Sequence, residues 1–542
     1  MPPPEVSTTS GSTEATLKSE ILSTAESKSA TVAHSTSQQI GTNGETPLSV
    51  FLSTFKGSRT QWVARQVIIM ICLLFRLGVG LGPYSGFNDS PMHGDFEAQR
   101  HWMEITYHLP IKDWYWYDLQ YWGLDYPPLT AYHSWVLGAI GSKIKPSWFE
   151  FGTSRGCEDV NLKSYMRSTV LISELLIYIP AVSVFVRWTI KNQKLSPLHH
   201  SIASAAILLQ PALILVDHGH FQYNAVMLGL ALIAITNILN DKLVVGSVFF
   251  VLALCFKQMA LYYSIPIFAY LLGICLFPRL NLPRFISLAV SVLTTFALVL
   301  APIVLASSDG LKGAYRQVLQ MLIRIFPFAR GLWEDKVGNF WCTLNIFVKL
   351  KHLYSAETLQ RFSLVATLVS VLPAFFMLLI YPRKKALIWG LSASAWGFFL
   401  FSFQVHEKSV LLPLLPVTLQ LATDPGVNVQ SYIYWINNVA VFSLWPLLKR
   451  DRLVLQYFAV SFLANWLMAS FTKLPEALLG KLIIMMSYAG IALLHIVEFL
   501  IEPPARYPDL WVIGNTTLSF GCFTIFLLWN YIQLYKACRA KV

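Results

Sequence analysis

Apolar runs of membrane length constrain the fold of this chain more than any other feature. Of its 542 residues, 55% are apolar and only 13% are charged. A helix needs about 20 apolar residues to cross a hydrocarbon core of about 30 Å, and a chain in lipid must satisfy its backbone hydrogen bonds internally. The sequence therefore predicts an all-α polytopic membrane protein with about 14 spanning helices. Their predicted starts lie near residues 63, 167, 200, 222, 243, 259, 284, 360, 386, 408, 431, 453, 480 and 509.

The net charge of +12 lies mainly in short loops between these runs. The basic groups are Arg187, Lys191 and Lys194; Arg279 and Arg284; Arg383-Lys384-Lys385; and Lys536, Arg539 and Lys541. Basic residues in short loops are typical of the bias that orients membrane spans. We therefore interpret the charge as a topology signal and expect no nucleic-acid partner.

The first 60 residues differ from the rest because they are rich in Ser and Thr and poor in large apolar residues. This composition predicts a disordered cytosolic tail over 1–60, followed by an integral membrane domain over 61–542. The first apolar run begins near Val63, too deep for a cleavable signal peptide. The seven cysteines are scattered; Cys157 and Cys342 lie in two long loops, which leaves a disulfide between them as a minor alternative.

Alternation of the spans predicts that the unusual polar residues share one face of the membrane. A cytosolic tail places the two long loops, about 83–166 and 307–357, in the lumen. Five polar clusters then fall on that face: Asp95 with Glu97, Asp125, Asp217–His220, Arg330–Lys336 and His406–Lys408. We expect them to form a single lumenal site. The loop Lys449–Arg452 is basic yet also predicted to be lumenal, so either the span count is off by one or this patch serves an anionic ligand.

The first long loop is predicted to contain two helices on the membrane surface. One follows Asp95, with Trp102, Ile105, Thr106 and Leu109 along one side. The other begins at Tyr126-Pro127-Pro128, because proline is tolerated in a first helical turn. Its apolar stripe is amphipathic in the manner of interfacial helices and consists of Leu129, Tyr132, Val136 and Ile140.

Asp95 and Glu97 are the first candidates for chemistry because they directly follow the first apolar run. Asp95 is equally compatible with a general base that deprotonates an acceptor hydroxyl and with a helix N-cap. An Asp-x-Glu pair can also bind a divalent cation through oxygen ligands. No third carboxylate is fixed nearby, so we treat a metal site as the minor alternative.

The remaining clusters combine cations and aromatic rings. His218, His220 and Lys257 are suited to hydrogen bonds with a phosphate or sugar, although a structural turn explains the histidines as well. Arg330 precedes Glu334 and Asp335 in a loop rich in aromatic residues; arginine forks suit phosphate oxygens and aromatic faces suit sugar rings. His406-Glu407-Lys408 divides two apolar runs, where ionisable residues are costly and usually functional.

Five motifs together resemble the dolichyl-phosphate-glucose-dependent glucosyltransferases of the endoplasmic reticulum. They are Gly94-Asp95-Phe96-Glu97-Ala98-Gln99-Arg100-His101-Trp102, Trp122-Gly123-Leu124-Asp125-Tyr126-Pro127-Pro128-Leu129-Thr130, Asp217-His218-Gly219-His220-Phe221-Gln222-Tyr223-Asn224, Phe326-Pro327-Phe328-Ala329-Arg330-Gly331-Leu332 and Val405-His406-Glu407-Lys408. The resemblance runs from about residue 80 to the C-terminus. Within that family, Glu334-Asp335-Lys336 resembles the members that add the first glucose to the nine-mannose lipid-linked glycan; the alternative is the sister enzyme that adds the second.

The resemblance implies a GT-C fold, dolichyl phosphate glucose as donor, a dolichyl-pyrophosphate oligosaccharide as acceptor and an inverting single displacement. It also implies a multi-pass enzyme of the endoplasmic reticulum membrane. Because cationic side chains can balance a lipid monophosphate leaving group, we expect no obligatory metal or other cofactor. Asp95 becomes the expected general base. Donor phosphate or sugar binding falls to His406, Glu407, Lys408, Arg330, His218, His220 and Lys257, and acceptor binding to Glu97, Asp125, Trp122, Glu334 and Asp335.

Two other functional classes explain the sequence less well. A transporter or lipid scramblase also needs many spans, but transporters typically place their sites near the midplane between internal repeats, and this sequence has no evident repeat. A membrane-bound O-acyltransferase with His406 as base would leave Asp95 without a task.

Overall fold

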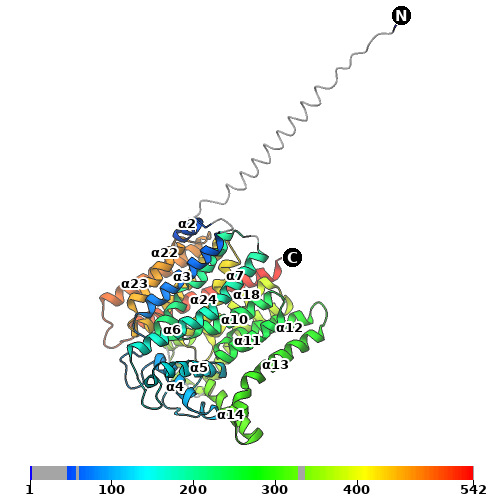
Figure 1. Cartoon of the computed structure of the whole chain (residues 1–542). Coiled ribbons are helices and arrows are strands. Elements are labelled where there is room, and N and C mark those ends of the chain that lie inside the picture. Colours follow the sequence, from blue (N-terminus) through cyan, green and yellow to red (C-terminus); the bar gives the residue numbers. More distant parts are fainter. Residues whose placement is uncertain (3–45, 56–59, 194, 327–335, 541–542) are drawn as a thin grey trace. The chain divides into compact units, whose positions relative to one another are not determined.

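The computed structural model describes residues 1–2, 46–55, 60–193, 195–326 and 336–540. Everything reported below belongs to one compact unit, Pro47–Val542. All regular structure in these described ranges is helical, as predicted (Figure 1). Three predicted site residues, Arg330, Glu334 and Asp335, lie outside the described residues.

Within the described ranges, eight helical segments are long and apolar enough to cross a membrane. They are α3 (Gln61–Gly80), α6 with α7 (Val160–Leu176, Tyr178–Asn192), α8 with α9 and η3 (Pro197–Leu208, Pro211–Ile214, Leu215–Phe221), η4 with α12 (Gln258–Tyr263, Ser264–Leu276), α13 (Leu282–Leu305), α17 (Ala356–Ile380), α23 (Leu478–Leu500) and α24 (Leu510–Arg539). Three shorter apolar helices are α10 (Asn224–Leu239), α11 (Leu243–Phe256) and α22 (Val454–Met468). The chain is therefore a polytopic membrane protein.

The predicted run near residue 408 is not one spanning helix. It is broken into η5 (Glu407–Val410), α19 (Leu411–Leu419) and η6 (Gln420–Ala422). The α-helical part has only 9 residues and contains Pro416, and at 1.5 Å per residue it is far shorter than a bilayer. The predicted runs near 386 and 431 form α18 (Lys384–Phe401) and α20 (Val427–Ser443).

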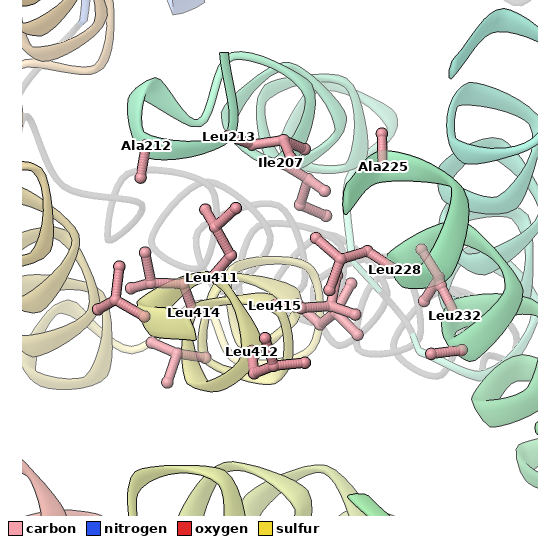
Figure 2. Packing of buried hydrophobic residues seen from close by; sticks show 14 of the residues in the cluster. Ile207, Ala212, Leu213, Ala225, Leu228, Leu232, Leu411, Leu412, Leu414 and Leu415 are labelled. Carbon is pink, nitrogen blue, oxygen red and sulfur yellow. The ribbon is translucent and has the colours of Figure 1, made fainter. Parts of the chain in front are cut away.

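Short buried α19 is enclosed by the longer helices (Figure 2). Leu411, Leu412, Leu414 and Leu415 are each at most 2% exposed and face Ile207 of α8 and leucines and alanines of α9 and α10. Around them α10 packs against α7 and α11, and α18 packs against α17 and α24. The leucine cluster thus fixes where α19 and the preceding His406–Lys408 segment lie.

A short helix lies within the stretch, residues 1–60, that was predicted to be a disordered tail. Residues Pro47–Ser53 form α2, whose Leu48 and Leu52 are buried. This helix packs against α8 and α22, so burial of its two leucines explains why it is ordered although the surrounding composition is polar.

Both helices predicted in the first long loop are present, as α4 (Asp95–His108) and α5 (Pro128–Ile144), and they pack against each other. The 3-10 turns η1 (Ile111–Asp113) and η2 (Pro146–Trp148) follow them. Helix α14 (Gly310–Ile325) lies near the same end of the unit, low in Figure 1. Its Gln317 and Gln320 donate to backbone carbonyls of the loop between α4 and α5.

The remaining short elements connect these helices. They are α15 (Phe340–Phe347), α16 (Leu350–Leu353), α21 (Trp445–Arg450) and η7 (Ser470–Thr472). The last residues of α21 matter most, because they lead into the site.

Candidate active site

Asp95 is the first residue of α4 and the centre of a charged cluster. Its N-cap is Gly94, in extended conformation, and no side chain caps the helix. Three groups donate to one oxygen of Asp95, Oδ2: Lys408 Nζ at 2.5 Å, Gln222 Nε2 at 2.5 Å and His220 Nε2 at 2.9 Å. Among the described residues none donates to Oδ1. The N-cap alternative is therefore wrong, and the carboxylate keeps an oxygen for another partner.

His220 reaches Asp95 because its segment is a π-helix, η3, and not the tight turn expected from the sequence. Single turns of π-helix are rare and frequently occur at functional sites. Two backbone contacts tie η3 to the loop before α4. The Ser85 N–H donates to the His220 carbonyl at 3.0 Å, and Arg167 donates to the Pro83 and Gly219 carbonyls.

Asp451 is the unexpected member of the cluster. Its side chain is 3% exposed and contacts His220 Nδ1 through Oδ2. The Arg450–Arg452 part of this loop therefore lies on the same side as Asp95, whereas Lys449 pairs with Glu498. The signal in the sequence was a single acid between Arg450 and Arg452, whose charge the basic patch concealed.

Two cavities meet at Asp95. The larger, of about 480 Å³, is lined by Asp95, Trp102, Trp122, Asp125, Tyr126, Arg324, Phe398, Phe403, His406, Glu407, Lys408 and Arg450, among others. The second, of about 440 Å³, is lined by residues 83–89, His93, Gly94, Asp95, Trp122, His220, Arg450, Asp451 and Arg452. Asp95, Trp122 and Arg450 line both, so Asp95 can contact a molecule in either cavity.

Trp122 is held between the cavities by two hydrogen bonds. Its Nε1 donates to the Met92 carbonyl at 2.5 Å, and its own carbonyl accepts from Trp102 Nε1 at 2.8 Å. Arg324, at the end of α14, donates to the neighbouring Gly123 carbonyl at 2.9 Å. The aromatic wall of the larger cavity is thereby fixed by three elements distant in sequence.

The charges around Asp95 set its protonation state. Burial would raise the pKa of Asp95, but Lys408 and His220 outweigh that effect and hold the pKa well below its usual range. Asp95 is consequently ionised at neutral pH, as a proton acceptor must be.

The described polar clusters converge as predicted, although four residues lie elsewhere than expected. Glu97 faces Arg100 and Tyr121, and lines neither cavity. His218 is buried against Glu174 at 2.6 Å. Their charges are satisfied inside the protein, so neither is placed to contact a substrate.

Lys257 and His220 do not line the larger cavity and contact the groups around Asp95 instead. Lys257 is buried and donates to Gln222 Oε1 at 2.9 Å and Asn224 Oδ1 at 2.7 Å, so it holds the amide that contacts Asp95. His220 lines the smaller cavity and not the larger. We reassign both from the donor phosphate to the support of Asp95.

No described group of three or more His, Cys, Asp and Glu side chains is arranged to hold a metal ion. All seven cysteines are free thiols, so the possible Cys157–Cys342 disulfide is absent.

Comparisons with known proteins identify the family of the chain. The model of the ALG6, ALG8 glycosyltransferase family matches residues 67–529, which include all of the elements that line both cavities. The chain belongs to the ALG6/ALG8 glycosyltransferase family.

Individual members of the ALG6/ALG8 family are similar over nearly their whole length. The Saccharomyces cerevisiae dolichyl pyrophosphate Man9GlcNAc2 alpha-1,3-glucosyltransferase is 49% identical over 523 residues, covering 91% of this chain and 95% of its own. A probable enzyme of the same name from Schizosaccharomyces pombe is 49% identical over 492 residues, covering 90% and 95%. The Rattus norvegicus enzyme is 39% identical over 510 residues, covering 87% and 97%.

Proposed function

We propose that this chain is a dolichyl pyrophosphate Man9GlcNAc2 alpha-1,3-glucosyltransferase that uses dolichyl phosphate glucose as donor and adds the first glucose. The names of relatives that match nearly the whole chain support the acceptor and the linkage. We further propose a GT-C architecture in the endoplasmic reticulum membrane, with Asp95 facing the lumen. The observation that carries the proposal is the carboxyl group of Asp95, bound by a lysine where two cavities meet.

The reaction is a single displacement. An acceptor mannose hydroxyl has a pKa far above 7, so it needs a base as it attacks. Asp95 takes the hydroxyl proton while the oxygen bonds to C1 of glucose and the C1–O bond to phosphate breaks. Attack opposite the phosphate inverts the anomeric centre, and dolichyl phosphate leaves as an anion.

Cationic groups stabilise that leaving group. Lys408 and His406 line the larger cavity beside Asp95, where fixed charges act more strongly than in water because the surroundings are apolar. Because these side chains can balance a monophosphate, we expect no obligatory metal ion.

The two cavities have different linings, and each lining suits a different substrate. The larger cavity combines Lys408 and His406 with aromatic side chains such as Phe398 and Tyr126, which suits a phosphate joined to a glucose ring. The smaller is lined mainly by polar side chains and the backbone of residues 83–89, which suits a glycan. We assign the donor to the first and the end of the acceptor glycan to the second.

Lys408 has two competing partners in this scheme. Without donor its ammonium group binds Asp95 Oδ2. A phosphate in the larger cavity attracts the same ammonium group. Sharing it weakens its hold on Asp95 and raises the basicity of the carboxylate when the donor is bound.

The test is glucose transfer by the purified full chain from a short-chain dolichyl phosphate glucose. Parallel reactions contain the nine-mannose lipid-linked acceptor, its monoglucosylated product, or the first acceptor with EDTA. We expect transfer to the nine-mannose acceptor alone, and undiminished transfer in EDTA.

Transfer only to the monoglucosylated acceptor would reassign the chain to the second glucose addition. Loss of transfer in EDTA, restored by a divalent cation, would contradict the metal-free mechanism. No transfer to either acceptor would overturn the proposed function.

A further inference from the structure

His220 bridges two carboxylates from distant parts of the chain. Its Nε2 lies 2.9 Å from Asp95 Oδ2, and its Nδ1 contacts Asp451 Oδ2. Asp95 precedes Asp451 by more than 350 residues in the sequence, and the two meet only through this ring. The imidazole is 1% exposed and Asp451 is 3% exposed, whereas Asp95 is 20% exposed. The line of groups therefore runs from two nearly buried side chains in the wall of the smaller cavity to Asp95, which borders both cavities.

We propose that Asp451 is a positioning residue for the glucosyl transfer, acting on Asp95 through His220. This inference rests on the proposed function and assigns a role that the five sequence motifs do not contain. Asp451 does not line the larger cavity. It lies in the wall of the smaller one, but its side chain is 3% exposed and its Oδ2 contacts His220, so its effect is transmitted by the histidine ring.

Hydrogen-bond chemistry gives the direction of the effect. A neutral imidazole has one N–H donor, and which nitrogen carries it depends on the partner of the other; the imidazolium has two. Asp451 accepts from Nδ1–H and fixes the plane of the ring. With carboxylates on both sides, both nitrogens carry protons, so Nε2 donates to Asp95 Oδ2.

The consequence for Asp95 is orientation. His220, Gln222 and Lys408 all bind Oδ2, which fixes the rotation of the carboxylate and leaves Oδ1 for the acceptor hydroxyl. Lys408 Nζ also lies 3.3 Å from His220 Nε2. The carboxylate of Asp451, on the far side of the ring, offsets the repulsion between that ammonium group and a protonated imidazole.

The surrounding charges do not duplicate Asp451. Arg450 and Arg452 line the same cavity but carry the opposite charge. Arg167 contacts the neighbouring Gly219 carbonyl from α6. Glu174 is engaged by Arg76 and His218. Among the described residues, only Asp95 and Asp451 present carboxylates to His220.

The test compares Asp451→Asn, His220→Gln and the double variant in the transfer assay, with kcat and KM measured separately for donor and acceptor. Asparagine keeps the size of the side chain and an oxygen that can accept from Nδ1–H, but it removes the negative charge that favours protons on both ring nitrogens. We expect kcat to fall about 10- to 100-fold. The figure is taken by analogy from histidines that bind a metal, where loss of the orienting partner typically costs that factor. Both KM values should stay within about two-fold, because Asp451 acts on Asp95 and not on the binding of either substrate.

The double variant distinguishes a positioning role from a general loss of structure. Residues that act as a unit give non-additive effects, so we expect the double variant to be about as active as His220→Gln alone. The matched control is Lys449→Gln. Lys449 lies in α21, the helix that directly precedes Asp451, and the substitution removes its ion pair with Glu498 of α23. It should keep the wild-type kcat.

Several outcomes overturn the proposal: an unchanged kcat in Asp451→Asn, multiplying effects in the double variant, or an equal loss in Lys449→Gln. The wild-type reaction in the same series separates this claim from the proposed function. If the wild type transfers glucose and Asp451→Asn does so equally well, only the role of Asp451 fails. If the wild type transfers none, the proposed function fails.

Discussion

Helix α4 carries two clusters of charge that differ in how they are compensated. Asp95, at its first position, is 20% exposed and borders both cavities. Within the next three turns, Glu97, Arg100 and Glu104 form a second cluster whose side chains are at most 3% exposed. Both clusters come from one stretch of sequence, and both sit in a predominantly apolar protein.

The buried cluster satisfies itself. Arg100 donates to Glu97 and to Glu104 at 2.7 Å, and to Ser154 Oγ at 2.6 Å. Burial alone would raise the pKa of Glu104, but His101, Arg100 and the Gly152 N–H lower it to about 2. Every partner is part of the protein, and no cavity is lined by these three side chains.

In the Asp95 cluster, the charged side chains also border the cavities, where a ligand can contact them. Lys408 and His220 face one carboxylate oxygen, and Arg450 lines both neighbouring cavities. Cationic groups beside an accessible anion suit a phosphate substrate, whereas the Arg100 cluster only fixes α4 in place. In this protein, charges that are buried against one another hold the fold, whereas charges that border a cavity are available to a substrate.

The largest effect on activity is expected for Asp95→Asn. A positioned general base contributes typically 10²- to 10⁴-fold to a rate, so kcat should fall by about that factor. The amide keeps the size of the side chain, and the site is open to water, so the melting temperature in detergent should change little. Single-turnover transfer with saturating donor measures the rate. Wild-type kcat in this variant would remove Asp95 from the reaction.

Arg100→Met should show the opposite pattern. It leaves two buried carboxylates unpaired, and breaking a buried ion pair in this way costs about 3–5 kcal/mol. We expect a much lower melting temperature, while kcat per folded molecule stays close to that of the wild type. Thermal unfolding in detergent and activity of the monodisperse fraction measure the two properties.

The matched variant is Arg100→Met combined with Glu97→Gln and Glu104→Gln, which removes the unpaired charges and should recover part of the stability. If Arg100→Met instead lowered kcat without changing the melting temperature, the division between the two clusters would be wrong.

Lys408→Met should weaken donor binding and leaving-group stabilisation at every pH, and a further, smaller effect on the ionisation of Asp95 is expected in acid. Asp95 must be ionised to accept a proton, and Lys408 helps to hold the pKa of Asp95 well below its usual range. Activity should thus persist in the wild type as the pH falls below neutral. In Lys408→Met the pKa of Asp95 rises, so the acid limb of kcat/KM should move to higher pH.

The comparison uses profiles normalised to their own maxima, because loss of the lysine also weakens donor binding. An acid limb at the same pH in both proteins would mean that Lys408 does not control the ionisation of Asp95.

The sequence predicted the helical class, the two loop helices and the convergence of Asp95, His220 and Lys408 well. Membrane-length runs restrict the backbone to helices, and alternation of spans assigns distant loops to a common face. Pro127 and Pro128 likewise marked the start of α5 at Pro128.

The partners of individual side chains could not be predicted in the same way. Glu97 and Asp95 are two residues apart, yet on a helix that spacing turns them about 200° away from each other. Which of them faced a cavity depended on Ser154 and Tyr121, whose positions are set by tertiary packing. Asp451 was missed because its partner, His220, lies in a π-helix that no local pattern revealed.

The smallest predicted effect sharpens the boundary between the two clusters. Tyr121 donates its hydroxyl to Glu97 Oε1 at 2.9 Å, although its neighbour Trp122 lines both cavities. Tyr121→Phe removes one hydrogen bond to a charged group that Arg100 still holds, so the free energy of unfolding should fall by about 1.5–3 kcal/mol at most. Since the hydroxyl belongs to the self-contained cluster, kcat and both KM values should be unchanged. A raised acceptor KM would instead place Glu97 in contact with the glycan, as the sequence alone had suggested.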